Sequence, residues 1–267
     1  MKMKILIGCP TFGIDPDPRR WMTSMLTASN EIVRMGGEVN YCFPYRKGVC
    51  DADNQIVKTA IAIEADYILR LDDDIWGVQR GDITKLLEAD KEFISAVTFT
   101  NDFPYALMAG NKKDKSMSLK YIRSNDGNFL DEITGHGIQT CDLTATPFTL
   151  WKVSMFDKFL YPFFVKEPEC PPDSTFCDKC AGLGIQPYVH MDIQLNHREV
   201  TPWNRLHLFN SRARELLMKR KLDPTTAIYK KMADMFGEDG LKDLLSLKGT
   251  LEEEKIKNEN TNSNLSE

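Results

Sequence analysis

Short apolar runs alternate with longer amphipathic stretches over the first hundred residues of the chain. The runs have the length of buried strands, and the stretches between them repeat apolar residues every three or four positions, as helices packed on a sheet do. Strands are predicted at 3–9, 38–43, 65–71 and 93–99, and helices at 21–35, 51–64 and 82–89. This alternation predicts an α/β fold with a mixed, mostly parallel sheet flanked by helices.

The middle of the chain departs from that alternation. Between 117 and 150, short β-prone pieces are separated by turn signals such as Asn125-Asp126-Gly127-Asn128. They predict an antiparallel hairpin inserted against the parallel part, with one strand at 140–150. Helices near 153–160 and 174–183 and a strand at 186–190 follow.

The last part of the chain changes character twice. After Trp203 the pattern is helical, over 204–222, 225–236 and 241–247. Residues 251–267 hold five Glu, four Asn and only three aliphatic residues, which is too little apolar surface to offset the entropy of ordering. We therefore expect a domain over 1–200, a C-terminal helical extension over 201–248 packed on it, and a disordered acidic tail over 249–267.

Composition narrows the class of protein. The 267 residues carry a formal net charge of -5, and sequence-independent nucleic-acid binding would need a basic domain. No apolar run approaches the ~18 to 20 residues of a membrane span, and the apolar run of residues 1–8 is too short for a signal peptide. The seven cysteines are odd in number and scattered, as in a reducing compartment. We therefore expect a cytoplasmic protein.

Three consecutive aspartates, Asp72-Asp73-Asp74, directly follow the apolar run 65–71. In parallel α/β sheets this end of a strand is where ligands bind. Adjacent carboxylates repel one another, and Mg²⁺ or a similar cation relieves the repulsion while binding phosphate oxygens. In an extended loop Asp72 and Asp74 point the same way, so the outer pair is predicted to face a metal. The alternative is a solvated acidic turn.

Two segments carry a resemblance to a known family. The segment 66–75 resembles the Asp-X-Asp segment of nucleotide-sugar-dependent glycosyltransferases of the GT-A fold, in particular the family 2-like group. The segment 173–185, which begins Asp-Ser-Thr-Phe-Cys, resembles the Glu-Asp-X-X-Phe-Cys element of that family, and the strand after it leads to His197. Weaker matches are Cys9-Pro10-Thr11 and Asp53-Asn54, so the resemblance spans residues 4 to 199.

The resemblance implies a mixed sheet flanked by helices and a metal-bound nucleoside-diphosphate sugar as donor. Asp72 would touch the ribose or the metal, Asp74 would bind Mn²⁺ or Mg²⁺ on the diphosphate, and His197 would be a further ligand. A set of nearby residues would face the nucleotide: Pro10, Thr11, Asp53 and Asn54.

By the same resemblance, Asp173 would be the catalytic base. A carboxylate that only takes the proton of the acceptor hydroxyl leaves one displacement at the sugar carbon, so we expect inversion. Apart from the resemblance, Arg198 and Arg205 lie close in sequence to the proposed site and would help to neutralise the diphosphate. The acceptor is not specified by the sequence.

Each candidate residue also has a structural interpretation. Asp173 would serve as N-cap of a helix that begins at Ser174, and His197, like His136 and His190, would be a packed or surface residue. Cys177-X-X-Cys180 is half of a zinc site, to which Cys170 and His190 would add ligands. The alternative is that the two thiols of this motif pack inward on one helix face.

Two other functions stay open. A catalytically inactive GT-A-like binding or scaffold protein is suggested by Pro172, where the family has an acidic residue, and by 144–147, which lacks the glycines of the acceptor-side loop. An aspartate-nucleophile phosphatase is another Asp-rich alternative. Membrane contact would be at most peripheral, through the basic helix 204–222.

Overall fold

The computed structural model divides the chain into two compact units, Met1–Arg205 and Leu206–Glu267. The structure describes residues 2–11, 18–100, 106–114, 116, 118–119, 130–168, 170–198 and 201, all of which belong to the first unit. The predicted helical extension from 202 on and the predicted acidic tail lie outside the described residues.

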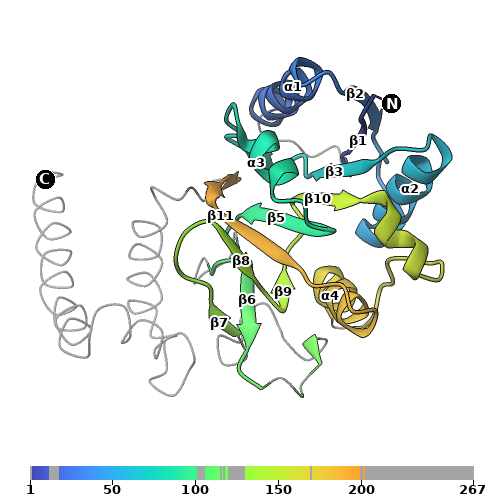
Figure 1. The fold of residues 1–267 in the computed structure, drawn as a ribbon. Coiled ribbons are helices and arrows are strands. Elements are labelled where there is room, and N and C mark those ends of the chain that lie inside the picture. Colours follow the sequence, from blue (N-terminus) through green and yellow to red (C-terminus); the bar gives the residue numbers. More distant parts are fainter. Residues whose placement is uncertain are drawn as a thin grey trace, which may run out of the picture. The chain divides into compact units, whose positions relative to one another are not determined.

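A seven-stranded mixed sheet forms the centre of the first unit (Figure 1). Five strands run parallel to one another: β1 (Lys4–Gly8), β2 (Glu38–Cys42), β3 (Tyr67–Leu71), β5 (Phe93–Val97) and β11 (Tyr188–Gln194). Two run against them: β8 (Ile138–Thr140) and β10 (Phe148–Lys152). The order across the sheet is β2-β1-β3-β10-β5-β11-β8. The fold is therefore the predicted mixed, mostly parallel α/β sheet flanked by helices.

Helices cover both faces of this sheet (Figure 1). One face carries α1 (Pro18–Arg34) and α3 (Asp82–Glu88), which pack through residues such as Ile32 and Leu86 on Ile5 and Leu69. The other face carries α2 (Val49–Ala62), the 3-10 helix η2 (Val153–Lys158) and α4 (Pro172–Gly182). There an aromatic cluster forms the core; it consists of Phe93, Trp151, Phe156, Phe159, Phe163, Phe164 and Phe176.

Two smaller sheets lie beside the main one. β6 (Ala109–Lys112) pairs antiparallel with β7 (Leu130–Glu132) and with β9 (Leu143–Thr144). β4 (Ile75–Trp76) pairs antiparallel with β12 (Asn196–His197). The second pair joins the segment after the acidic triplet to the segment after β11.

The prediction for 140–150 was wrong in one respect, because these residues form the end of β8, all of β9 and part of β10 rather than one strand. β10 lies between β3 and β5 in the middle of the main sheet. It presents apolar side chains to both faces, with Leu150 in the α1 and α3 core and Trp151 in the aromatic cluster. A strand buried on both faces belongs in the interior of a sheet.

Among the described residues, no helix has the length and apolar character needed to cross a membrane.

Candidate active site at the carboxyl ends of the strands

The acidic triplet lies where β3 ends, and the beginning of β10 lies beside it. Because β10 runs against β3, its first residues reach the edge of the sheet at which β3 stops. The backbone N–H of Asp72 donates to the carbonyl oxygen of Pro147 at 2.8 Å. The loop that enters β10 is therefore fixed against the triplet.

A buried arginine connects this loop to α2. Arg70 alternates along β3 with Leu69 and Leu71, so its side chain lies on the α2 face. Its guanidinium is 3% exposed and contacts Asp53 Oδ1 at 2.8 Å and Asp72 Oδ1 at 2.9 Å. It also donates to the carbonyl oxygen of Thr146 at 2.6 Å. A buried charge needs such partners, and Arg70 thereby holds three chain segments together.

The same threonine holds the predicted catalytic base. Thr146 donates its hydroxyl to Asp173 Oδ1 at 2.7 Å. Asp173 lies in the first turn of α4, whose N-cap is Pro171 and which has no side-chain cap hydrogen bond. The N-cap interpretation of Asp173 is therefore wrong, since its carboxylate is directed to the loop before β10.

Burial raises the pKa of all three of these carboxylates, Asp53, Asp72 and Asp173. Burial is the main cause at Asp72, and the charges of Asp74 and Asp53 add to it against the opposing effect of Arg70, so that the pKa of Asp72 reaches about 7. Burial likewise raises the pKa of Asp173, although Arg70 and the hydroxyl of Thr146 act to lower it. A carboxyl group with a raised pKa is a stronger base than a solvated one.

The third aspartate of the triplet has different partners. Asp74 Oδ2 lies 3.4 Å from His197 Nε2 and accepts from Arg198 Nε at 2.8 Å. Burial acts to raise the pKa of Asp74, but these two cationic partners outweigh it and hold the pKa below its ordinary value. Burial acts to lower the pKa of His197, but Asp74 raises it above its ordinary value. The β4–β12 pairing brings these side chains together.

Asp74 and His197 present donor atoms that suit a divalent cation. His197 Nδ1 lies 2.8 Å from the carbonyl oxygen of Phe99, and because a carbonyl only accepts, Nδ1 carries the hydrogen. Nε2 faces Asp74, which favours the protonated ring. Loss of the Nε2 proton would free the lone pair that binds a cation. A backbone carbonyl orients metal-binding histidines in this way, so the pair fits a cation.

Asp72 faces Arg70 rather than this pair. Over the residues that the structure describes, no group of three or more histidine, cysteine, aspartate or glutamate side chains is arranged to hold a metal ion. The three predicted ligands thus do not converge. Mg²⁺ often takes one or two protein carboxylates and completes its shell with phosphate oxygens and water. Asp74 and His197 would therefore hold it together with a phosphorylated substrate.

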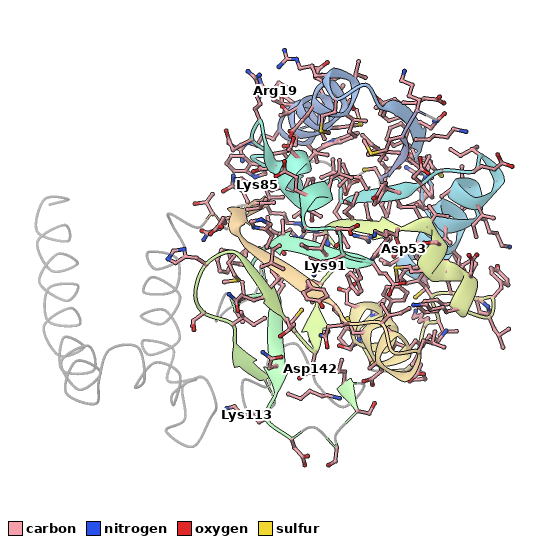
Figure 2. The ribbon with its side chains drawn as sticks, in the orientation of Figure 1. Arg19, Asp53, Lys85, Lys91, Lys113 and Asp142 are labelled. Atoms are coloured by element: carbon pink, nitrogen blue, oxygen red, sulfur yellow. The ribbon has the colours of Figure 1, made fainter. Side chains whose placement is uncertain are left out.

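The residues predicted to face a nucleotide fall into two groups. Pro10 and Thr11 follow β1 at the same edge of the sheet, and Thr11 is partly exposed, with its N–H donating to the carbonyl oxygen of Pro44 at 3.0 Å. Asp53 and Asn54 are buried, at 1% and 6% exposure, and Asp53 lies in the interior of the molecule (Figure 2).

Asn54 exchanges two hydrogen bonds with the backbone of Phe164, at 2.8 and 3.1 Å. Asp53 and Asn54 thus have structural roles next to the site: Asp53 binds Arg70, and Asn54 fixes the segment that leads to α4.

The remaining candidates lie apart from this arrangement. His136 is exposed and lies 3.5 Å from Asp192, while His190 is buried. All seven cysteines are buried and free, and the thiol of Cys177 donates to the carbonyl oxygen of Thr144. Burial raises the pKa of Cys177 and of Cys180, and these thiols serve as core residues.

Sequence reasoning missed the roles of Arg70 and Thr146. A signal for Arg70 was present, because it is a charged residue inside an otherwise apolar run, and such a residue needs a buried partner. Thr146 gave no signal, since its neighbours Asp173 and Arg70 are brought to it only by the placement of β10.

Comparisons with known proteins find similarity in structure and not in sequence. No family model matches the chain, and no curated protein matches it. The structure is similar to the crystal structure of A197 from STIV, with a TM-score of 0.47 and 14% sequence identity, over 74% of this chain and 85% of that chain. At this distance, function has to be argued from the site itself.

Proposed function

We propose that this chain is a glycosyltransferase that uses Mn²⁺ or Mg²⁺ and a nucleoside-diphosphate sugar, and that it transfers the sugar to an acceptor hydroxyl with inversion. One observation carries the proposal. A candidate base, Asp173, and a candidate cation-binding pair, Asp74 and His197, lie at the same edge of the sheet, and Arg70 and Thr146 connect the base to the acidic triplet.

Asp173 is assigned the base role because of its position and its environment. The hydroxyl of Thr146 donates to Oδ1, and in the proposed reaction the Asp173 carboxylate accepts the proton of an acceptor hydroxyl. Burial raises the pKa of Asp173, which makes it a stronger base than a solvated carboxylate. Because Asp173 takes a proton and does not attack the sugar, a single displacement inverts the anomeric carbon.

Asp74 and His197 are assigned to the cation and the diphosphate. A bound divalent cation supplies Lewis-acid stabilisation of the departing diphosphate. Asp74, with a pKa held below its ordinary value, stays ionised over the whole physiological range. Asp72, paired with Arg70, adds negative potential beside this pair, which favours a cation and not a free anion at this position.

The decisive test separates the base from the binding of the donor. Asp173→Asn keeps the shape of the side chain and removes its basicity, so turnover should fall by about 10² to 10⁴. Donor binding, followed as the rise in melting temperature with Mn²⁺ and each of a panel of nucleoside-diphosphate sugars, should stay within about twofold of the wild type.

Three results would count against the proposal. Wild-type turnover in Asp173→Asn would remove Asp173 from the mechanism. Donor binding without transfer or hydrolysis in the wild type would favour a binding protein, and hydrolysis of an aryl phosphate would favour a phosphatase.

A further inference from the structure

Arg198 has an unusual backbone conformation for its residue type. Its φ is +51°, in the left-handed region that a residue with a long side chain seldom occupies. Such a conformation persists where surrounding contacts hold it, and it is common at functional sites. Within the part of the chain that the structure describes, the hydrogen bonds of Arg198 come from the segment that begins with Asp74.

Three hydrogen bonds join Arg198 to that segment. Its N–H donates to the carbonyl oxygen of Asp74 at 3.0 Å, and its carbonyl oxygen accepts from Trp76 Nε1 at 3.0 Å. Its side chain donates through Nε to Asp74 Oδ2 at 2.8 Å. The backbone contacts fix where Arg198 stands, and the side-chain contact places a positive charge on the carboxylate assigned to the cation.

This side chain covers the oxygen that also faces His197. Asp74 Oδ2 is shared between Arg198 Nε and His197 Nε2. A divalent cation bound between Asp74 and His197 would lie against the guanidinium, and like charges at such a separation repel. Arg198 therefore has to leave Asp74 when a cation binds there.

Arg198 is able to leave because its side chain is 59% exposed. Among the described residues, neither Nη atom has a hydrogen-bond partner, so Asp74 holds the guanidinium through Nε alone. An exposed ion pair of this kind contributes little stability. The guanidinium fork suits two phosphate oxygens at once.

We propose that Arg198 neutralises Asp74 before the cation binds, and that it moves from Asp74 to the donor diphosphate when the cation takes its position. The inference rests on the proposed function and assigns Arg198 a donor-binding role in it. The backbone contacts with Asp74 and Trp76 keep Arg198 within reach of both partners throughout the exchange.

The test compares two ligands on one variant. Arg198→Asn removes the charge and retains a residue that tolerates the left-handed conformation. Mn²⁺ alone is titrated by the loss of the electron paramagnetic resonance signal of the free ion, and Mg²⁺ with inorganic pyrophosphate is titrated by calorimetry. Neither readout depends on activity. Arg34→Asn, at the exposed end of α1, is the matched control.

The exchange predicts opposite changes in the two affinities. Arg198→Asn should bind Mn²⁺ alone at least about threefold more tightly, because a competing charge is gone. It should bind Mg²⁺ with pyrophosphate about tenfold more weakly, because a charge-assisted contact is lost. Arg34→Asn should change neither. A purely structural role for Arg198 would weaken both.

Failure of this inference is distinguishable from failure of the proposed function. If the wild type binds Mg²⁺ with pyrophosphate but Arg198→Asn binds Mn²⁺ no more tightly than the wild type, the exchange is refuted and the proposed function stands. If neither protein binds Mn²⁺ or the pyrophosphate complex, both are refuted.

Discussion

At the scale of single residues, the charge of the site depends on one buried guanidinium. Arg70 contacts the carboxylates of Asp53 and Asp72 and lowers the pKa of Asp173 through its charge. One cation does not balance three buried or half-buried carboxylates, and the pKa of Asp72 rises to about 7 as a result of burial and of the charges of Asp74 and Asp53. The metal-free site therefore holds a proton at mildly acidic pH.

That proton makes the stability of the metal-free protein depend on pH. The pKa of Asp72 is raised on folding from 3.8 to about 7, so its contribution to stability is complete below pH ~4 and is lost as the pH rises through ~7. The amide of the Asp72→Asn variant does not ionise, so the variant does not lose this contribution to stability as the pH rises. Relative to the wild type, its free energy of unfolding should therefore increase between pH 4 and pH 8, on the order of 1 to 2 kcal/mol after solvent screening.

Urea unfolding of both proteins in the presence of a chelator, at several pH values, measures this difference. Asp73→Asn serves as the control, because the pKa shift is assigned to Asp72. A difference between Asp72→Asn and wild type that stays flat from pH 4 to pH 8 would show that Asp72 has an ordinary pKa.

At the scale of elements, the loop that enters β10 is the part that joins the two halves of the site. Thr146 uses its carbonyl oxygen for Arg70 and its hydroxyl for Asp173. Because α4 begins at Pro172, this hydroxyl also fixes the first turn of that helix against the sheet.

Removing the hydroxyl tests this connection. Thr146→Val has nearly the same shape and should lower kcat about tenfold, because Asp173 loses the hydrogen bond that orients it. The KM for the donor should change little, since the triplet keeps Arg70. Thr146→Ser retains the hydroxyl and should keep most of the activity. Equal loss in both variants would point to packing rather than to orientation of the base.

The elements that sequence predicts well are those defined by local periodicity. The first three strands and two helices were predicted within a few residues, since each buries one face along a continuous segment. The position of β10 between β3 and β5 was not predicted, because strand order is not a local property. The same limit applies to the site. The acidic triplet follows from its sequence, but the pairing of Arg70 with Asp53 needs the α2 and β3 contact.

At the scale of the whole molecule, the candidate site is built from five separate segments. They lie around residues 53, 70–74, 146, 173 and 197–198, on α2, β3 and its following loop, the loop before β10, α4, and β12. Such an arrangement forms only when the complete sheet has formed. A ligand that contacts several of these segments should therefore stabilise the unit against unfolding.

Removal of the metal ion tests whether a cation takes part in donor binding and in the stabilisation that the donor provides. A chelator should abolish sugar transfer, and Mn²⁺ should restore it. The rise in melting temperature with donor should likewise require Mn²⁺. Each 1 kcal/mol of added stability raises the melting temperature by about 4 to 8 °C in a small domain and by less in a larger one. Asp74→Asn should lose the Mn²⁺-dependent part of this rise, whereas Asp73→Asn should retain it. A donor-induced shift unaffected by chelator would contradict a role for the cation in donor binding.

Under the proposed function, the two contacts of Thr146 have a consequence for how a change of acceptor would arise. A shift of α4 that moves Asp173 would also move residue 146, whose carbonyl oxygen binds Arg70. Because Arg70 binds Asp72, the acidic triplet would move as well. Changes of acceptor preference should therefore arise in segments that do not bear on α4 or on residue 146. Variants that gain a new acceptor by substitutions in α4 should need compensating substitutions near Arg70 and the acidic triplet.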